Sequence, residues 1–230
     1  MTFSIHQPNF IPWIGYFDKI AKSEVFIILD TVQYPRGKSV SNRNFIKSNN
    51  GDKVELVVPV SKPKGKDSKV TYREVNIAET KWQKKILKTL EYSYKKSRYF
   101  EEYFGYFESL FSMNDFCEMN ISFINKIIEL YEIDTKVYLL SDLKDIEGSK
   151  NDLIISIAKA LNADTYLSGQ GAKKYNDLDL YRENSIDLIY HEFSHPEYQQ
   201  MGNEFVPHLS IVDLLFNEGV NGINVFRKRD

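Results

Sequence analysis

Two things are scarce in this sequence: cysteine, and long uninterrupted runs of apolar residues. Cys117 is the single cysteine among 230 residues, which excludes an internal disulfide and any multi-cysteine metal site and fits a reducing compartment. No eighteen apolar residues stand together, and the N-terminus lacks the basic stretch, apolar run and cleavage site of a secretion signal. We therefore expect a soluble cytoplasmic protein without a membrane partner.

A large excess of one charge is also missing. The formal net charge is −2, from 30 basic and 32 acidic side chains, which argues against broad electrostatic binding to nucleic acid. Aromatic residues make up 14% of the chain, an amount that favours packed surfaces over disorder. The length suits one α/β domain over residues 1–230 that carries an insertion.

The first thirty residues indicate how the fold begins. Thr2–His6 predicts a short strand that must end before Pro8, because proline lacks an N–H and biases its predecessor away from helix. Pro12 suits the start of an amphipathic helix, and Val25–Leu29 has the pattern of a strand buried on both faces. Strand, loop, helix and strand in this order open a parallel sheet.

Polar residues follow both of these strands. They are His6, Gln7, Asn9 and Asp30. Ligands of open parallel sheets bind beyond the carboxyl ends of the strands. A right-handed crossover usually places its two strands next to each other, so we expect Asp30 and the loop from His6 to Asn9 to lie side by side.

Three further apolar runs extend the sheet: Thr135–Leu140, Thr165–Leu167 and Ile186–Tyr190. A helix is expected over Asp152–Leu161, capped by the Ser or Asn just before it. Small residues from Ser168 to Ala172 directly follow the second run. They would let a ligand approach main-chain N–H groups, or they form a plain strand-to-helix turn. The fold class is α/β, a mainly parallel sheet flanked by helices.

Residues 50–132 indicate an inserted β-hairpin and a helical lobe. Lys53–Val60 and Val70–Ile77 have strand patterns and are expected to pair around a mobile tip at Ser61–Lys69. From Glu79 to Tyr131 apolar residues recur three or four apart and predict three helices.

The segment Thr31–Asn44, between the opening unit and the hairpin, is polar. It contains Arg36 and Arg43, whose guanidinium groups could hold a phosphate or a carboxylate. A solvated surface loop explains the same composition equally well.

His191–His195 has the letters H-E-x-x-H of zinc proteases. That chemistry needs both histidines on one face of a helix. Here the first histidine ends a strand-like run and Pro196 follows the second, so we expect a loop and no metal site. His195 is the better functional candidate of the two because a rigid proline positions it.

The C-terminal segment from His191 onward is polar and rich in proline and glycine. Within it, Ser210–Asn217 predicts a helix capped by Ser210, with Asp213 in the first turn, where a carboxylate suits the helix dipole. The segment has too little apolar sequence to form a core. We expect His195, Tyr198 and Asp213 to close over the His6 loop and Gly169. If His195 is a base, His195→Ala should lower turnover by about two to four orders of magnitude.

Three separated stretches carry a family resemblance. They are HQPNFIPWIGYF at His6–Phe17, YLSG at Tyr166–Gly169, and the tail, which has His195-Pro196-x-Tyr198-x-Gln200 followed by FVPHLSIVDLLFN at Phe205–Asn217. In this order they span nearly the whole chain and closely resemble the WbqC-like protein family. That family is found with bacterial O-antigen and nucleotide-sugar genes, and its namesake has been suggested to attach glycine to an amino sugar.

A second similarity concerns the start of the first helix. A strand, a proline-containing loop and Trp13-x-Gly15-Tyr16 look like the H-x-G-H entry of the adenylate-forming and nucleotidyl-transferring fold that includes pantothenate synthetase. Trp13 and Tyr16 stand where that motif has its histidines, so His6 or Gln7 would replace them as phosphate contacts. A helix N-terminus that faces a polar loop is suited to anions.

The resemblance implies an amide-forming transferase or ligase. It would join an acyl or aminoacyl group, such as glycyl, to the amine of a nucleotide-linked amino sugar in the biosynthesis of O-antigen or another surface polysaccharide. A free acid donor implies ATP and Mg²⁺, whereas a pre-activated donor such as an acyl carrier does not need them. The alternative is a non-catalytic nucleotide-sugar-binding or scaffold protein of polysaccharide assembly.

Under the enzyme hypothesis, His6 or His195 is the base that deprotonates the ammonium. The helix from Pro12 and the Ser168–Gly169 loop receive phosphates, and Arg36 or Arg43 pairs with a carboxylate or pyrophosphate. Trp13 and Tyr16 stack on a base or a sugar, or pack in the core. The candidate set is His6, Gln7, Asn9, Trp13, Gly15, Tyr16, Asp30, Arg36, Arg43, Ser168, Gly169, His195, Tyr198 and Asp213.

Overall fold

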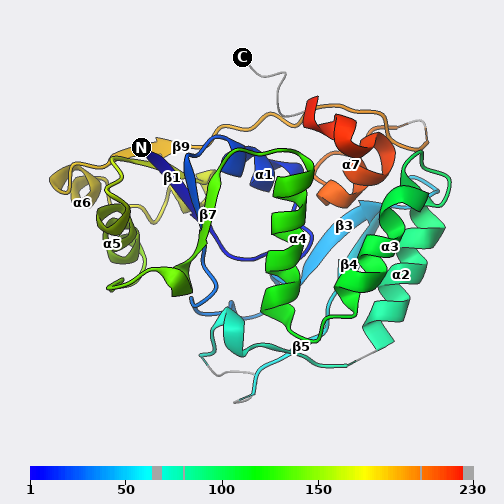
Figure 1. The fold of residues 1–230 in the computed structure, drawn as a ribbon, viewed down its shortest axis with the longest axis horizontal. Helices are drawn as coiled ribbons and strands as arrows, with labels where there is room; N and C mark the ends of the chain where they lie inside the picture. The colour runs from blue at the N-terminus through cyan, green and yellow to red at the C-terminus, as the bar shows by residue number, and fades with distance from the viewer. Residues whose placement is uncertain (64–68, 80, 203, 225–230) are drawn as a thin grey trace.

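A five-stranded parallel sheet lies at the centre of the computed structural model, which describes residues 1–63, 69–79, 81–202 and 204–224 (Figure 1). The strand order is β7-β2-β1-β8-β9. The strands are β1 (Thr2–His6), β2 (Val25–Ile28), β7 (Lys136–Leu139), β8 (Thr165–Ser168) and β9 (Asp187–Tyr190). The fold class and the five strands expected from the apolar runs are confirmed.

The register places the polar strand ends together. His6 of β1 pairs with Ile28 of β2, and the Leu29 amide donates to the His6 carbonyl at 2.8 Å. Asp30 follows directly. The prediction that Asp30 lies beside the loop after β1 is therefore confirmed.

Helices cover both faces of the sheet, and each face has its own core. Phe26 and Ile28 of β2 point to the face packed by α1 (Ile14–Ala21), whereas Val25 and Ile27 point to the face packed by α5 (Asn151–Leu161). All four residues of β2 are buried, which is the outcome expected for a central parallel strand. α6 (Leu178–Glu183) lies with α5 on the second face (Figure 1).

The larger core continues from α1 into the helical lobe. This lobe contains α2 (Lys81–Tyr94), α3 (Phe100–Phe111) and α4 (Phe116–Leu130), the three helices that the periodicity predicts. α7 (Ile211–Glu218), followed by the 3-10 turn η4 (Gly219–Ile223), packs against the lobe through Phe216. None of the helices in the described residues has the length and apolar character needed to cross a membrane.

The predicted hairpin pairs with a different partner. β4 (Lys53–Val57) is antiparallel to β3 (Arg43–Lys47), which belongs in part to the segment expected to be a polar loop. Pairing between the two predicted runs is limited to β5 (Val60–Ser61) and β6 (Asn76–Ile77), with the 3-10 turn η1 (Tyr72–Glu74) just before β6. The expected mobile tip includes residues 64–68, which lie outside the described residues.

The expected cap of α5 is also wrong. The helix begins at Asn151, and its N-cap is Lys150, which has a φ of 54° and makes no side-chain cap. The Asn151 side chain instead donates to the Tyr175 carbonyl at 3.0 Å and accepts from the Tyr181 hydroxyl at 3.2 Å. Tertiary contacts therefore take the amide away from its local capping role. The other 3-10 turns, η2 (Leu140–Asp142) and η3 (Gln170–Ala172), follow β7 and β8.

Candidate functional site

A hollow lies beyond the carboxyl ends of the central strands. The chain leaves β1 toward β2 and β7 but leaves β8 toward β9, so the sheet changes direction between β1 and β8. Such a switch point is where open parallel sheets bind ligands. One cavity here has a volume of about 680 Å³. Its walls include His6, Gln7, Lys19, Lys150, Tyr166, Gly169, Tyr175 and Asn176.

A second cavity of about 620 Å³ adjoins the first, beyond the ends of β2 and β7. The two share five lining residues, Ile5, Gln7, Leu29, Lys150 and Ile154. We call them together the carboxyl-edge crevice, and name its parts the β8 lobe and the β7 lobe. The β7 lobe is lined mainly by apolar side chains such as Leu140, Leu143 and Ile146, with Ser141 and Ser149 among them.

His6 lies in the wall of the β8 lobe. Its ring contacts the Tyr16 ring at a centroid distance of 4.7 Å, and its Nδ1 lies 3.2 Å from the Gln7 carbonyl oxygen. A carbonyl only accepts, so Nδ1 carries the proton and Nε2 is the basic nitrogen. Burial, and then the nearby Lys19, lower the pKa of His6 to about 3. The imidazole is therefore neutral at physiological pH.

Lys19 is a buried amine in the same lobe. It is 5% exposed, and its Nζ donates to the Ile5 carbonyl at 2.8 Å. Burial lowers the pKa of Lys19 to about 7. His6 and Lys19 thus have pKa values below their ordinary ones, because burial disfavours their charged forms.

The loop from Gln7 to Trp13 leads from the crevice, which Gln7 lines, to the start of α1. The Tyr16 hydroxyl donates to the Gln7 carbonyl at 3.0 Å. Ile11 has a φ of 35°, which a β-branched residue rarely adopts. Its carbonyl accepts from Asn44 at 2.8 Å and from Ser210 at 2.7 Å, so two distant segments hold this strained turn.

The start of α1 is covered. A Cβ added to Gly15 would lie 2.5 Å from the indole of Trp13, so glycine is required because the ring packs on this first turn. The Ile211 amide donates to the Pro12 carbonyl at 2.9 Å. The place proposed for a phosphate at this helix N-terminus is filled by an indole. Tyr16 and Asn9 are buried. Tyr16 packs in the core, which is one of the two alternatives expected for its ring.

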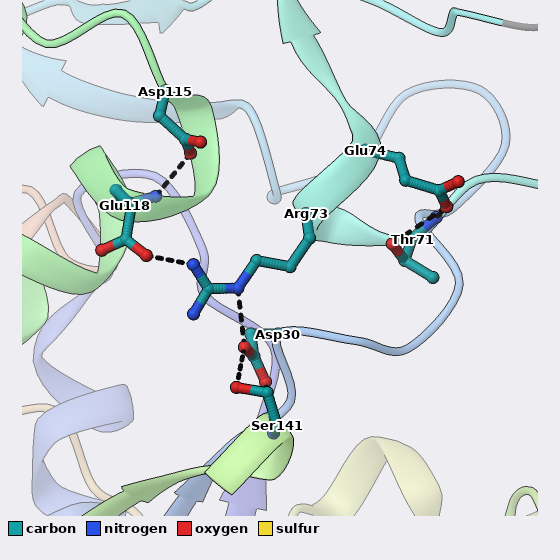
Figure 2. A network of polar contacts seen from close by, with 7 residues as sticks. All are labelled: Asp30, Thr71, Arg73, Glu74, Asp115, Glu118 and Ser141. Atoms are coloured by element: carbon teal, nitrogen blue, oxygen red, sulfur yellow. Dashed lines mark hydrogen bonds and ion pairs between the residues drawn. The ribbon is translucent and has the colours of Figure 1, made fainter.

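Asp30 is committed to an ion-pair network (Figure 2). It is fully buried and accepts from Arg73 Nε at 2.7 Å and from the Ser141 hydroxyl at 2.7 Å. Arg73, from η1, lies between Asp30 and Glu118 of α4 and pairs with both. Asp30 therefore ties the end of β2 to η1, η2 and α4, and its oxygens are already used.

The turn after β8 has one buried and one open position. Ser168 is fully buried and accepts from Asn176 Nδ2 at 3.0 Å. Gly169 lines the β8 lobe, and a Cβ added there would meet nothing within 4 Å. The backbone of this turn is thus accessible from the crevice while Ser168 holds the turn in place.

The other candidates gather elsewhere, in a group that we call the C-terminal cluster. Its members are Trp13, Phe193, His195, Tyr198, Phe205, His208 and Asp213. The rings of Trp13 and Phe193 are 5.0 Å apart, and those of His195 and His208 are 5.1 Å apart. Next to this cluster, the Ser210 hydroxyl donates to the Ile11 carbonyl and the Ile211 amide donates to the Pro12 carbonyl.

Asp213 is the buried acid of this cluster. It is fully buried and accepts from the hydroxyls of Tyr94 and Tyr198, each at 2.7 Å. Burial raises the pKa of Asp213, although both hydrogen bonds oppose the rise.

The C-terminal segment approaches the opening segment at residues 11–13, through Ser210, Ile211 and His208, and so lies beyond the loop from His6 to Asn9 at which the approach is expected. Tyr198 and Asp213 contact each other, and Asp213 also contacts Tyr94 of α2. Tyr198 contacts Gln200 and the rings of His195 and Phe205. Gly169 is not among these partners.

The two candidate arginines lie outside the crevice. Arg36 is exposed, and Arg43 in β3 pairs with Glu55 at 3.2 Å. Arg43 also lines a separate cavity of about 630 Å³ between the hairpin and Tyr34. Neither arginine lines the carboxyl-edge crevice.

The H-E-x-x-H letters fall on irregular backbone, as expected. No helix is present over residues 191–195. The His191 amide donates to the Ser168 carbonyl at 2.8 Å, and its Nε2 lies 2.6 Å from an Asp18 carboxylate oxygen. Within the described residues, no group of three or more His, Cys, Asp and Glu side chains is placed to hold a metal ion.

Residues 7–225 match the sequence profile of the WbqC-like protein family. The chain belongs to this family. It is 31% identical over 228 residues to the uncharacterized protein Rv1507c of Mycobacterium tuberculosis (strain ATCC 25618 / H37Rv), a match that covers 97% of this chain and 96% of that protein. No solved structure matches the chain significantly. The WbqC-like family is associated with polysaccharide gene clusters.

In this member of the WbqC-like family, sequence reasoning singles out His6, Gln7 and Gly169 of the β8 lobe but not several other lining residues, of which three matter for the chemistry. They are Lys19, Lys150 and Asn176. A signal existed for Lys19, because it lies in a short helix between two strands that are themselves expected to be buried. Lys150 and Asn176 carry no such signal, since their place depends on how loops return to the sheet.

Proposed function

We propose that the protein is an enzyme that forms an amide between an acyl or aminoacyl group, such as glycyl, and the amine of a nucleotide-linked amino sugar in the assembly of a surface polysaccharide. Membership of the WbqC-like family supports the link to polysaccharides. The carboxyl-edge crevice is the proposed active site, because it lies at the switch point of the sheet.

The β8 lobe carries the proposal because burial there lowers the pKa of two nitrogen bases, His6 and Lys19. Amide formation requires an uncharged amine, since an ammonium has no lone pair with which to attack an acyl carbon. The same burial that lowers the pKa of His6 to about 3 and that of Lys19 to about 7 would lower the pKa of a substrate amine bound beside them. The substrate amine would thus be uncharged and nucleophilic in the lobe without a strong base to deprotonate it.

His6 is the proposed proton acceptor. Its Nε2 is unprotonated, and its Nδ1 is held by the Gln7 carbonyl. Once the substrate nitrogen is bonded to the acyl carbon it becomes acidic, so a weak base in hydrogen-bond reach is sufficient. The C–N bond forms as the leaving group departs, and the amine proton passes to His6. Gln7 and Gly169 line the same lobe and would position the reacting groups.

The lining of the crevice also bears on the source of the activated acyl group. Lys150 and the start of α5 suit the phosphates of ATP or of the nucleotide sugar. The crevice lining includes no carboxylate among the described residues, and Asp30 is taken by Arg73, so Mg²⁺ has no protein carboxylate there. A pre-activated donor fits this lining better than a free acid with ATP.

The test is turnover followed by mass spectrometry. The protein is incubated with UDP- and dTDP-linked amino sugars and with glycine and ATP, or with a glycyl thioester without ATP. An amide-bearing product heavier by one glycyl group supports the proposal, and the donor that gives it settles the activation. If these sugar nucleotides raise the thermal stability but no donor yields product, the protein is instead a non-catalytic binder of polysaccharide assembly.

A further inference from the structure

Lys19 is a buried amine that has no carboxylate partner among the described residues. Its ammonium form has three N–H donors, and within the described residues a single acceptor, the Ile5 carbonyl, is used. Buried charges in proteins are ordinarily paired. At 5% exposure, Lys19 cannot rely on bulk water for compensation, and it lines a cavity of about 680 Å³.

The groups that face Lys19 across the lobe do not supply the missing negative charge. They are His6 from β1, Tyr166 from β8, Tyr175 after η3 and Lys150 at the start of α5. On α1 itself, the neighbouring Asp18 is paired with Lys22 at 2.9 Å and with His191 at 2.6 Å. Asp152 lies in the first turn of α5 but is not part of the lining.

Lys150 brings a second positive group to the same space. It is exposed, lines both lobes of the crevice and stands directly before the first turn of α5. The free N–H groups of a helix N-terminus favour an anion. Two cationic side chains and a helix start therefore surround a space in which no acid of the described chain is present.

We propose that the β8 lobe is an anion subsite, in which Lys19 and Lys150 bind a carboxylate or phosphate group of a substrate and Lys19 takes up a proton as the anion enters. The assignment of this anion to an amide-forming reaction rests on the proposed function, but the binding itself does not.

Proton uptake follows from the position of the lysine. With a pKa of about 7, Lys19 is largely neutral in the empty lobe at pH 8. A bound anion stabilises the ammonium form and raises this pKa. By linkage, the apparent association constant then falls by up to about tenfold for each pH unit above 7.

Calorimetric titration with two simple anions tests the subsite. Sulfate represents the phosphate group, and acetate represents the carboxylate, because neither titrates between pH 6 and 9. In the wild type, one anion should bind more weakly as the pH rises from 7 to 8.5, with proton uptake visible as a dependence of the heat on the buffer. The anion that binds more tightly identifies the group that the lobe recognises.

Variants locate the effect. Lys19→Met keeps the stem of the side chain and should weaken binding at least tenfold at pH 6.5 and remove the pH dependence. Lys150→Met should weaken binding but keep the dependence. Lys159→Met, which removes an exposed lysine from the far end of α5, is the matched control and should behave like the wild type.

Two results would contradict the proposed anion subsite. One is that the wild type binds neither anion, and the other is that its binding is independent of pH. The second needs no variant, so it decides the matter even if Lys19→Met does not fold. Neither anion is turned over, so the amide assay and this titration fail independently.

Discussion

The carboxyl-edge crevice and the C-terminal cluster both bury a charged side chain, but they treat it differently. Asp213 is fully buried and accepts hydrogen bonds from two tyrosines. Lys19 has one carbonyl partner and lines a large cavity. A buried charge whose partners come from the protein holds the fold together, whereas one that lacks them is available to a ligand. This contrast separates Asp213 from Lys19 as candidates, although the sequence favours the former.

The largest expected effect is loss of stability in Asp213→Ala. The hydroxyls of Tyr94 and Tyr198 would lose their acceptor in a closed interior, so the free energy of unfolding should fall by about 3–5 kcal/mol. Urea denaturation measures it. Tyr198→Phe removes one donor and should cost only about 1 kcal/mol. A stable Asp213→Ala protein with no turnover would reverse the contrast and make Asp213 a catalytic group.

The next effect is on turnover in His6→Asn. Loss of the proton acceptor should lower kcat by about 10²–10³-fold with little change in stability. His208→Asn is the matched control, because it removes an imidazole from the C-terminal cluster and asparagine tolerates the φ of 60° at that position. Equal losses of kcat in the two variants would show that the crevice is not where the chemistry occurs.

A gain in stability is expected for Lys19→Met. The pKa of Lys19 in the folded protein, about 7, is below its ordinary value of 10.5. Between these values the unfolded chain binds more protons, so wild-type stability rises with pH. The free-energy cost of burying the charged Lys19 ammonium reaches its full value below pH 7. Lys19→Met should therefore be more stable by on the order of 2 kcal/mol at pH 7, and the advantage should shrink toward pH 10. Thermal denaturation at several pH values measures it, and a constant difference would contradict it.

The smallest effect is expected for His195→Ala. His195 contacts the rings of Tyr198, Phe205 and His208 and is not part of the crevice lining. Turnover per folded molecule should change less than tenfold, while stability falls by about 1–2 kcal/mol. A loss of two to four orders of magnitude in kcat would instead restore His195 as the base.

The sequence predicted the sheet well because its strands are short apolar runs that only a buried sheet accommodates. The hairpin was assigned to the wrong partner because β3 (RNFIK) contains two apolar residues and looks like a loop. Its pairing with β4 depends on packing under α2 and α7. The cap of α5 failed for the same kind of reason, since contacts from Tyr175 and Tyr181 decide where Asn151 points.

The site was predicted in part. His6 and Gly169 follow from the rule that ligands bind at strand ends, and they line the crevice. Asp213 is expected near a ligand because its segment has too little apolar sequence to form a core, but Tyr94 from α2, which is 119 residues away, donates to it in the buried interior. Local spacing carries no information about such a contact. The signal for Lys19 in the sequence is its place in a short helix between two strands that are expected to be buried.

The bond between Ser210 and Ile11 has a consequence for how the chain is made. It joins residues 199 positions apart. At a synthesis rate of about 5–20 residues per second, the turn at Ile11 is therefore made roughly 10–40 s before Ser210, which donates to it. The packing of Phe10 against Phe111 of α3 does not need the C-terminal segment. What is missing until then is Ser210, one of the two hydrogen-bond donors to the Ile11 carbonyl, so we expect the strained turn at Ile11 to reach its final form only after the C-terminal segment has been made.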